Sequence, residues 1–239
     1  MKAVILAGGK GTRGKPYTDY FPKAMIPANG KPIIDYILKY LGSFNFITEI
    51  IIISDFKGLG GQIKNFVGDA KYKKRISFIQ DSQSGTGGDL LHIKKKLTDS
   101  EFILWFADNL SPINLKEMLQ VFKKKNSIAC IATRTRKTEE TGFAKVENGI
   151  IKEFLEKPTI RLQMPECLGV YILSSKILNK IKKSKKQVNL SHDVLEELSK
   201  NDIVSAYDIG KTPWLDVESP IVIDRYQKLV KQIIKQMEC

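Results

Sequence analysis

The chain has 239 residues, of which 42% are hydrophobic, and its 39 lysine and arginine residues exceed its 26 acids by a formal net charge of +13. This composition is that of a globular protein with a substantial core, and no apolar run approaches the roughly 20 residues of a membrane span, so we expect no membrane partner. The basic residues form scattered runs without interleaved aromatic residues, so we interpret them as a solvated surface that favours phosphate-rich small substrates and expect no nucleic-acid partner. Three scattered cysteines, without metal-ligand spacing, indicate a reducing, cytoplasmic compartment: Cys130, Cys167 and Cys239.

Strands and helices are predicted to alternate through the first 135 residues. Apolar, β-branched runs predict strands at Lys2 to Ala7, Glu49 to Ser54, Arg75 to Gln80, Glu101 to Phe106 and Ser127 to Arg134. Helical periodicity predicts helices at Pro32 to Phe44, Leu59 to Val67, Gly88 to Leu97 and Asn114 to Lys125. This alternation predicts an α/β fold with a mixed, mostly parallel sheet flanked by helices. Ligands bind outside the carboxyl ends of such strands, so the loops after Ala7, Gln80 and Phe106 should meet.

The pattern changes after residue 135 and predicts a small β-rich part. Short strands are expected at Phe143 to Val146, Ile150 to Glu156 and Glu166 to Leu173, with Glu147-Asn148-Gly149 as a hairpin turn. Helices at Ser175 to Lys183 and Ser191 to Lys200, a strand at Ile203 to Asp208 and a helix from Ser219 to Lys235 complete the chain. The chain has no internal repeat and no low-complexity linker, so we expect a single domain over residues 1–239.

The loop after the first strand contains two glycine-rich patterns that each suggest a different nucleotide-binding motif. Gly9, Gly11 and Gly14 match G-x-G-x-x-G, and Gly9 to Lys15 matches G-x-x-x-x-G-K. A dinucleotide-binding motif requires a helix to begin at once, but prolines at 16, 22 and 27 prevent one. Pro16 also occupies the position where a Walker loop needs a hydroxyl for Mg²⁺. Neither a dinucleotide fold nor a P-loop is therefore expected.

The same loop still has the chemistry of a phosphate site. Glycines allow backbone N–H groups to close around phosphate oxygens, and Arg13 adds a planar fork for bidentate contact. Lys23, which follows Pro22, adds a second cation on a stiffened loop. A long irregular stretch of this kind inside a compact domain is usually functional or disordered, so an incidental surface turn is not expected here.

The order of these residues resembles the opening signature of the sugar-1-phosphate nucleotidyltransferase family. That signature is an apolar strand followed by G-G-x-G-T-R, a proline, P-K, a proline and K-P. The chain supplies Leu6 to Arg13, Pro16, Pro22-Lys23, Pro27 and Lys31-Pro32 in that order. The resemblance implies a Rossmann-like fold of the nucleotide-diphospho-sugar transferase type, with residues 1–135 as the nucleotide-binding half and 136–239 as the sugar-phosphate half.

The resemblance also implies roles for individual residues. Arg13, Lys23 and Asp108 would be catalytic, and Asp108 and Asp216 would bind Mg²⁺, the expected cofactor. Residues that would bind nucleotide are Leu6, Ala7, Gly8, Gly9, Gly11, Thr12, Arg13, Gln80, Gly85 and Thr86. Residues that would bind the sugar phosphate are Asp108, Gly142, Glu156, Lys157 and Gly169. The implied partners are an NTP and a sugar 1-phosphate, and relatives often form homo-oligomers.

The chain departs from the family pattern at several positions. Gly14 stands where Leu is usual, Ala107 where Gly is usual, and Cys167-Leu168 where many members have Asn-Ala. Val217-Glu218-Ser219-Pro220 replaces the usual Gly-Thr-Pro. Because the sequence ends soon after its last predicted helix, we do not expect the acetyltransferase activity that a β-helix carries in some relatives.

Other interpretations of these residues remain open at this point. Asp108 also suits a turn with Asn109, Asp216 suits the start of the last helix, and Glu156-Lys157-Pro158 suits a solvated strand end. For the whole chain, the alternatives are a silent sugar-nucleotide sensor on the same fold, a nucleic-acid-binding module, and a cytidylyltransferase that acts on a non-sugar phosphate. Gln80 can pair with several nucleobases because its amide both donates and accepts hydrogen bonds.

Overall fold

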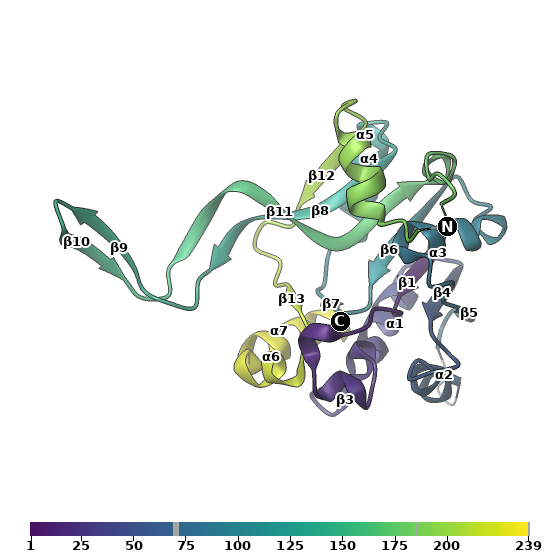
Figure 1. The fold of residues 1–239 in the computed structure, drawn as a ribbon, viewed down its shortest axis with the longest axis horizontal. Helices are drawn as coiled ribbons and strands as arrows, with labels where there is room; N and C mark the ends of the chain where they lie inside the picture. The colour runs from purple at the N-terminus through teal and green to yellow at the C-terminus, as the bar shows by residue number, and fades with distance from the viewer. Residues whose placement is uncertain (69–71, 185, 239) are drawn as a thin grey trace.

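The computed structural model describes residues 1–68, 72–184 and 186–238, and its centre is a seven-stranded sheet (Figure 1). Cys239, one of the three cysteines considered above, lies outside the described residues. The sheet order is β12-β8-β11-β6-β1-β4-β5. The strands are β1 (Lys2–Leu6), β4 (Glu49–Ser54), β5 (Arg75–Gln80), β6 (Glu101–Phe106), β8 (Ala129–Thr138), β11 (Thr159–Ser174) and β12 (Val204–Asp208).

All strands of this sheet except β11 run in the same direction. β1 pairs in parallel with β4 and β6, β4 pairs in parallel with β5, and β8 pairs in parallel with β12. β11 is antiparallel to both of its neighbours, β6 and β8. The predicted mixed, mostly parallel sheet is therefore confirmed, and the carboxyl ends of β1, β4, β5 and β6 lie along one edge.

Helices cover both faces of the sheet, because the central strands are apolar on both sides. On one face lie α1 (Ile33–Ser43), α2 (Gly61–Gly68), α4 (Leu115–Lys124) and α7 (Gln227–Glu238), packed against alternate strand residues such as Ile5 and Trp105. On the other face lie α3 (Gly85–His92) and α5 (Glu196–Ser199), packed against Val4 and Leu104. The alternation follows from the two-residue period of a strand.

Several helices differ from their predicted bounds. α3 begins at Gly85, three residues before the predicted start, so the second glycine segment forms the first turn of this helix and not the loop before it. The helix predicted from Ser175 is a 3-10 turn, Ser175–Asn179, and Leu190–Leu195 is a π-helical turn before α5. The single C-terminal helix was wrong: α6 (Pro220–Arg225) and α7 are separated by Tyr226, whose φ of −108° and ψ of 30° lie outside the helical region.

A β-hairpin projects away from the helices and the sheet. β9 (Phe143–Glu147) and β10 (Ile150–Leu155) pair antiparallel around Asn148 and Gly149, which both have positive φ, as the predicted turn requires. The hairpin continues the ladder between the end of β8 and the start of β11, and in Figure 1 it lies at the far end of a long ribbon. We call residues 139–158 the arm. Among the described residues, no helix is long and apolar enough to cross a membrane.

Candidate functional site

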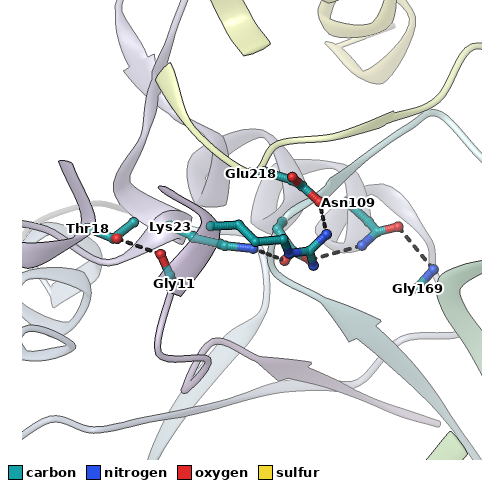
Figure 2. A network of polar contacts seen from close by, with 8 residues as sticks. Gly11, Thr18, Lys23, Asn109, Gly169 and Glu218 are labelled. Atoms are coloured by element: carbon teal, nitrogen blue, oxygen red, sulfur yellow. Dashed lines mark hydrogen bonds and ion pairs between the residues drawn. The ribbon is translucent and has the colours of Figure 1, made fainter. Parts of the chain in front are cut away.

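The loop between β1 and α1 folds into three short 3-10 turns at the carboxyl edge of the sheet. The turns are Thr12–Gly14, Tyr17–Asp19 and Lys23–Met25, followed by a small ladder between β2 (Pro27–Ala28) and β3 (Lys31–Pro32). The chain reaches its first α-helix only at Ile33, as the three prolines predict. The Thr18 hydroxyl donates to the carbonyl of Gly11 at 2.6 Å and closes the loop on itself (Figure 2).

Two adjoining clefts open beside this loop and contain most of the residues predicted to bind nucleotide. A cleft of about 300 Å³ is lined by Arg13, Lys23 and Asp108, and also by Leu6, Ala7, Gly9, Gly11, Thr12 and Thr86. A neighbouring cleft of about 650 Å³ shares Leu6, Gly9 and Thr86 with it, and adds Gly8 and Gly85. The structure therefore brings together three segments that are far apart in sequence, because they all follow the carboxyl ends of strands.

Gln80 behaves differently from the other predicted nucleotide-binding residues. Its amide donates to the carboxylate of Asp55 at 2.7 Å, and Gln80 lines neither of the two clefts. The wall of the cleft of about 650 Å³ also contains five residues that the sequence did not indicate: Asp55, Asp81, Gln83, Asp89 and Gln187. Asp55 and Asp81 directly follow β4 and β5, so the edge-of-sheet argument would have found them.

Asp108 and Asp216, which are 108 residues apart, are placed together by a short antiparallel ladder. β7 (Asn109–Leu110) pairs with β13 (Leu215–Asp216), with Asp216 opposite Asn109. The N–H of Val217 donates to the carbonyl of Asp108 at 2.7 Å and extends the pairing by one residue. Backbone hydrogen bonds on both sides thus fix the two carboxylates next to each other.

The electrostatics of this pair are unbalanced. Lys23 donates to the Asp108 carboxylate at 3.0 Å, and its side chain is only 14% exposed. Burial, and then the charge of Asp108, raise the pKa of Asp216 to about 6, and the charges of Lys23 and Arg13 oppose this shift. One carboxylate oxygen of Asp216, Oδ1, is buried without a hydrogen-bond partner. A buried acceptor of this kind requires a donor or a cation to satisfy it.

These residues fit a magnesium ion that is shared with substrate. Among the described residues, no group of three or more acidic, histidine or cysteine side chains could hold a metal by itself. Mg²⁺ is typically bound by one or two carboxylates together with waters and substrate phosphates. Asp108 and Asp216, with the unsatisfied Oδ1, supply such a set of ligands.

Asn109 connects the three segments that meet at this pair, and the sequence analysis assigned it no role beyond a turn. Its buried side chain donates to Asp108 at 3.0 Å and accepts from the N–H of Gly169 at 3.0 Å and from the indole of Trp214 at 2.9 Å. A Cβ atom at position 169 would lie 2.8 Å from Cγ of Asn109 and closer still to its Nδ2. The absence of a side chain at Gly169, which was predicted to bind sugar, is thus explained by the packing of Asn109.

The two departures at Gly14 and Glu218 from the family pattern lie in contact with each other. A Cβ atom on Gly14 would lie 2.5 Å from the backbone oxygen of Glu218 and 2.7 Å from Cγ2 of Thr18. The Glu218 carboxylate forms an ion pair with Arg13 (Figure 2). Position 14 lacks a side chain because the segment that carries Glu218 occupies its space.

A third and larger cleft, of about 800 Å³, begins at Asp216 and Arg13 and continues toward α6. The guanidinium carbon of Arg134 lies 4.5 Å from the centre of the Trp214 ring, and Arg134 also forms an ion pair with Glu166 at 2.6 Å. All three residues line this cleft. The predicted sugar-phosphate residues Gly142, Glu156 and Lys157 do not line it: they are exposed on the arm, where the ring of Phe154 covers Gly142.

The chain is similar to known nucleotidyltransferases over most of its length. The family model described as "Nucleotidyl transferase" matches residues 2–223. The "Probable glucose-1-phosphate cytidylyltransferase" of Bacillus subtilis is 29% identical over 230 residues, which cover 87% of each chain. The "UTP--glucose-1-phosphate uridylyltransferase" of Synechocystis is 28% identical over 240 residues, which cover 89% of this chain and 61% of that protein. A solved UDP-glucose pyrophosphorylase in complex with UDP-glucose has a TM-score of 0.70 at 20% identity and covers 98% of each chain.

The chain belongs to the nucleotidyl transferase family, since the family model covers most of its length. Its fold is that of the nucleotide-diphospho-sugar transferases. The resemblance found in the opening loop is therefore confirmed. The chain nevertheless spans only about three fifths of the length of some curated relatives, including the Synechocystis protein.

Proposed function

We propose that this protein transfers a nucleoside monophosphate from an NTP to a sugar 1-phosphate and releases pyrophosphate, with Mg²⁺ as cofactor. The observation that carries the proposal is the position of the two aspartates. Asp108 lines the cleft formed by the glycine loop, Asp216 lines the larger cleft, and Arg13 lines both. A cation held there would lie where a nucleotide in one cleft meets an acceptor in the other.

The reaction requires orientation and charge neutralisation more than acid–base chemistry. The acceptor phosphate is already an anion, so in-line attack on the α-phosphorus needs no general base and no covalent intermediate. Arg13 and Lys23 would stabilise the triphosphate and the leaving pyrophosphate, and glycine N–H groups of the loop would hold the phosphate oxygens. Mg²⁺ on Asp108 and Asp216 would neutralise charge on the reacting phosphates.

The sugar 1-phosphate would bind in the cleft of about 800 Å³. Trp214, with Arg134 stacked on it, offers a flat wall and a cation in the larger cleft. Lys157 would hold the phosphate of the sugar and Glu156 a sugar hydroxyl, which requires the arm to come to a cleft. Asn109 would act by orienting Asp108.

The test is pyrophosphate release with Mg²⁺, each NTP in turn and a panel of sugar 1-phosphates that also includes inositol 1-phosphate and phosphocholine. We expect turnover with at least one NTP and sugar phosphate, and its loss in Asp108→Ala while circular dichroism shows that the fold is intact. Full activity of Asp108→Ala would contradict the metal assignment. Nucleotide binding without turnover for any acceptor would favour a silent sensor on the same fold.

A further inference from the structure

The cleft of about 800 Å³ carries an excess of positive charge. Six cationic and four acidic residues line it, a net charge of +2. Four of the cations form an ion pair with an acidic side chain: Arg13, Arg134, Lys137 and Arg225. The side chains of Arg136 and Lys211 have no acidic partner in the part of the chain that the structure describes. A cleft lined by uncompensated charge of one sign attracts a ligand of the opposite sign.

Arg136 is distinguished from an ordinary surface cation by the residue opposite it. Three alternate residues of β8 line the cleft, and each has a partner directly opposite on β11: Arg134↔Glu166, Arg136↔Arg161 and Thr138↔Thr159. The first pair forms an ion pair, and the third is a hydroxyl contact at 2.9 Å. The second pair places two arginines opposite each other, and like charges in this position destabilise a β-ladder. A bound anion would relieve this repulsion.

Arg136 lies beyond the place where the sugar ring would bind. Trp214 is two residues before Asp216, and its ring lies against the guanidinium group of Arg134. A strand rises roughly 3.3 Å per residue, so Arg136 is displaced from Arg134 by about 7 Å along β8, toward the base of the arm. A sugar whose 1-phosphate meets a cation at Asp216 would extend past Trp214 and direct its far end toward Arg136.

Lys211 reaches the same cleft from the neighbouring strand. β12 pairs in parallel with β8, and the Thr135 hydroxyl donates to the carboxylate of Asp208 at 3.1 Å. The N–H of Ile209 donates to the carbonyl of Thr133 at 2.9 Å, so β8 also holds the start of the turn that carries Lys211. Two adjacent strands of the sheet thus each supply one unpaired cation to this cleft.

Neither the NTP nor a neutral sugar accounts for these two cations. Arg13 and Lys23 line the cleft formed by the glycine loop, and Arg136 and Lys211 line neither that cleft nor the adjoining cleft of about 650 Å³. The hydroxyl groups of a neutral sugar both donate and accept hydrogen bonds, so they require no net charge from the protein. A guanidinium group matches the geometry of a carboxylate or a phosphate, which it can bind through two parallel hydrogen bonds.

We propose that the sugar 1-phosphate used by this protein carries a second anionic group, a carboxylate or a phosphate, and that Arg136 and Lys211 bind this group. The inference rests on the proposed function and names the class of acceptor for it. The second anion takes no part in the transfer: the 1-phosphate oxygen still attacks the α-phosphorus, and pyrophosphate still leaves. Its role is to select and orient the acceptor.

The first test compares matched acceptors that differ only in this group. Glucose, galactose and mannose 1-phosphate are each assayed beside the corresponding uronic acid 1-phosphate and the corresponding 1,6-bisphosphate, with Mg²⁺ and each NTP in turn. For at least one sugar, we expect kcat/KM to be about 10–100-fold higher with an anionic acceptor than with the neutral one, as hydrogen bonds between charged groups allow. The difference should lie mainly in KM, because the second anion is bound equally in the ground and transition states. The better of the two anionic acceptors identifies the group as a carboxylate or a phosphate, and equal or better use of the neutral acceptors would overturn the proposal.

The second test assigns the preference to the two cations. The double variant Arg136→Met/Lys211→Met removes both charges and keeps most of each apolar stem. The matched control is Arg75→Met, which removes an exposed cation on β5, at the opposite end of the sheet from β8 and β12. We expect the ratio of kcat/KM for the anionic acceptor to that for the neutral acceptor to fall to about one in the double variant and to stay at the wild-type value in the control. An unchanged ratio in the double variant would overturn the assignment, and an equal fall in the control would show that the preference arises from net charge alone.

Acceptor binding can also be measured without turnover, which separates this proposal from the proposed function. Calorimetric titrations use Mg²⁺ and saturating α,β-methylene analogues of the NTPs, whose α-phosphorus cannot release the leaving group. We expect the Kd of the anionic acceptor to be at least about tenfold lower than that of the neutral acceptor in the wild type, and this difference to disappear in the double variant. Equal affinities in the wild type, or no binding of any anionic acceptor, would refute the anion site. Selective binding without turnover for any natural NTP would support the anion site and contradict the proposed function.

Discussion

Gly169→Ala tests whether Gly169 is a sugar contact or a clearance for Asn109. The new methyl group would displace the Asn109 side chain, because its Cβ would lie 2.8 Å from Cγ of that residue. The displaced amide would leave two N–H donors unsatisfied, the backbone of Gly169 and the indole of Trp214. Each buried donor left without a partner costs about 1–3 kcal/mol, so we expect the two together to cost about 2–6 kcal/mol.

The assay is urea unfolding of a double-mutant cycle made of Gly169→Ala, Asn109→Ala and the pair. Asn109→Ala removes the group with which the methyl clashes, so the double variant should be hardly less stable than Asn109→Ala alone. The coupling energy between the two positions should then equal in magnitude the loss caused by Gly169→Ala alone, about 2–6 kcal/mol. For a chain of this size, each kcal/mol lost should lower the melting temperature by about 2–4 °C.

The opposite pattern would refute the packing explanation. If Gly169 is glycine because a sugar approaches it, Gly169→Ala should raise KM for the sugar phosphate without a loss of stability. The two substitutions would then act independently, within about 0.5 kcal/mol.

Three further predictions concern the charged and close-packed groups around the site. Asp216→Asn should abolish turnover and raise the free energy of unfolding of the free protein at pH 7.5. The pKa of Asp216 is raised from 3.8 to about 6, so the gain in stability is at most about 3 kcal/mol and about 1 kcal/mol after solvent screening. Because the folded wild type binds the Asp216 proton more tightly than the unfolded chain does, its free energy of unfolding falls as pH rises from about 4 to 6. Melting curves should therefore show that the variant is more stable at pH 7.5 and that this difference disappears below pH about 4. A difference that persists below pH about 4 would contradict this cause. Gly14→Leu should cost about 1–3 kcal/mol in urea unfolding, because the backbone of Glu218 occupies the space, and a neutral result would mean that this segment moves easily. Glu218→Gln should lower KM for the NTP, by no more than about fivefold, because it releases Arg13 from an exposed ion pair in which Arg13 is 65% exposed; a higher KM would show that Glu218 orients Arg13 productively.

The sequence by itself determined the fold class and the phosphate loop. Local periodicity identified the strands of the sheet, since apolar runs such as Glu49–Ser54 need no tertiary information to be recognised. Prolines at 16, 22 and 27 excluded a helix after β1 because proline lacks an N–H and clashes with the preceding turn. The carboxyl-edge rule placed Asp108 beside the glycine loop, since parallel strands end at the same edge of a sheet.

Only the tertiary structure decided which distant residues meet. The pairing of β7 with β13 brings Asp216 to Asp108, and a two-residue ladder has no sequence signature. The close contacts of Gly14 with Glu218 and of Gly169 with Asn109 explain why both positions are glycine. Neither contact can be recognised from a local sequence pattern. The sequence also predicted the hairpin of the arm, but its direction is set by long-range pairing of β8 with β11, which includes two register shifts. Local pattern specifies a strand and its buried face, whereas the direction in which a ribbon leaves a sheet depends on bulges and partners that a local pattern does not contain.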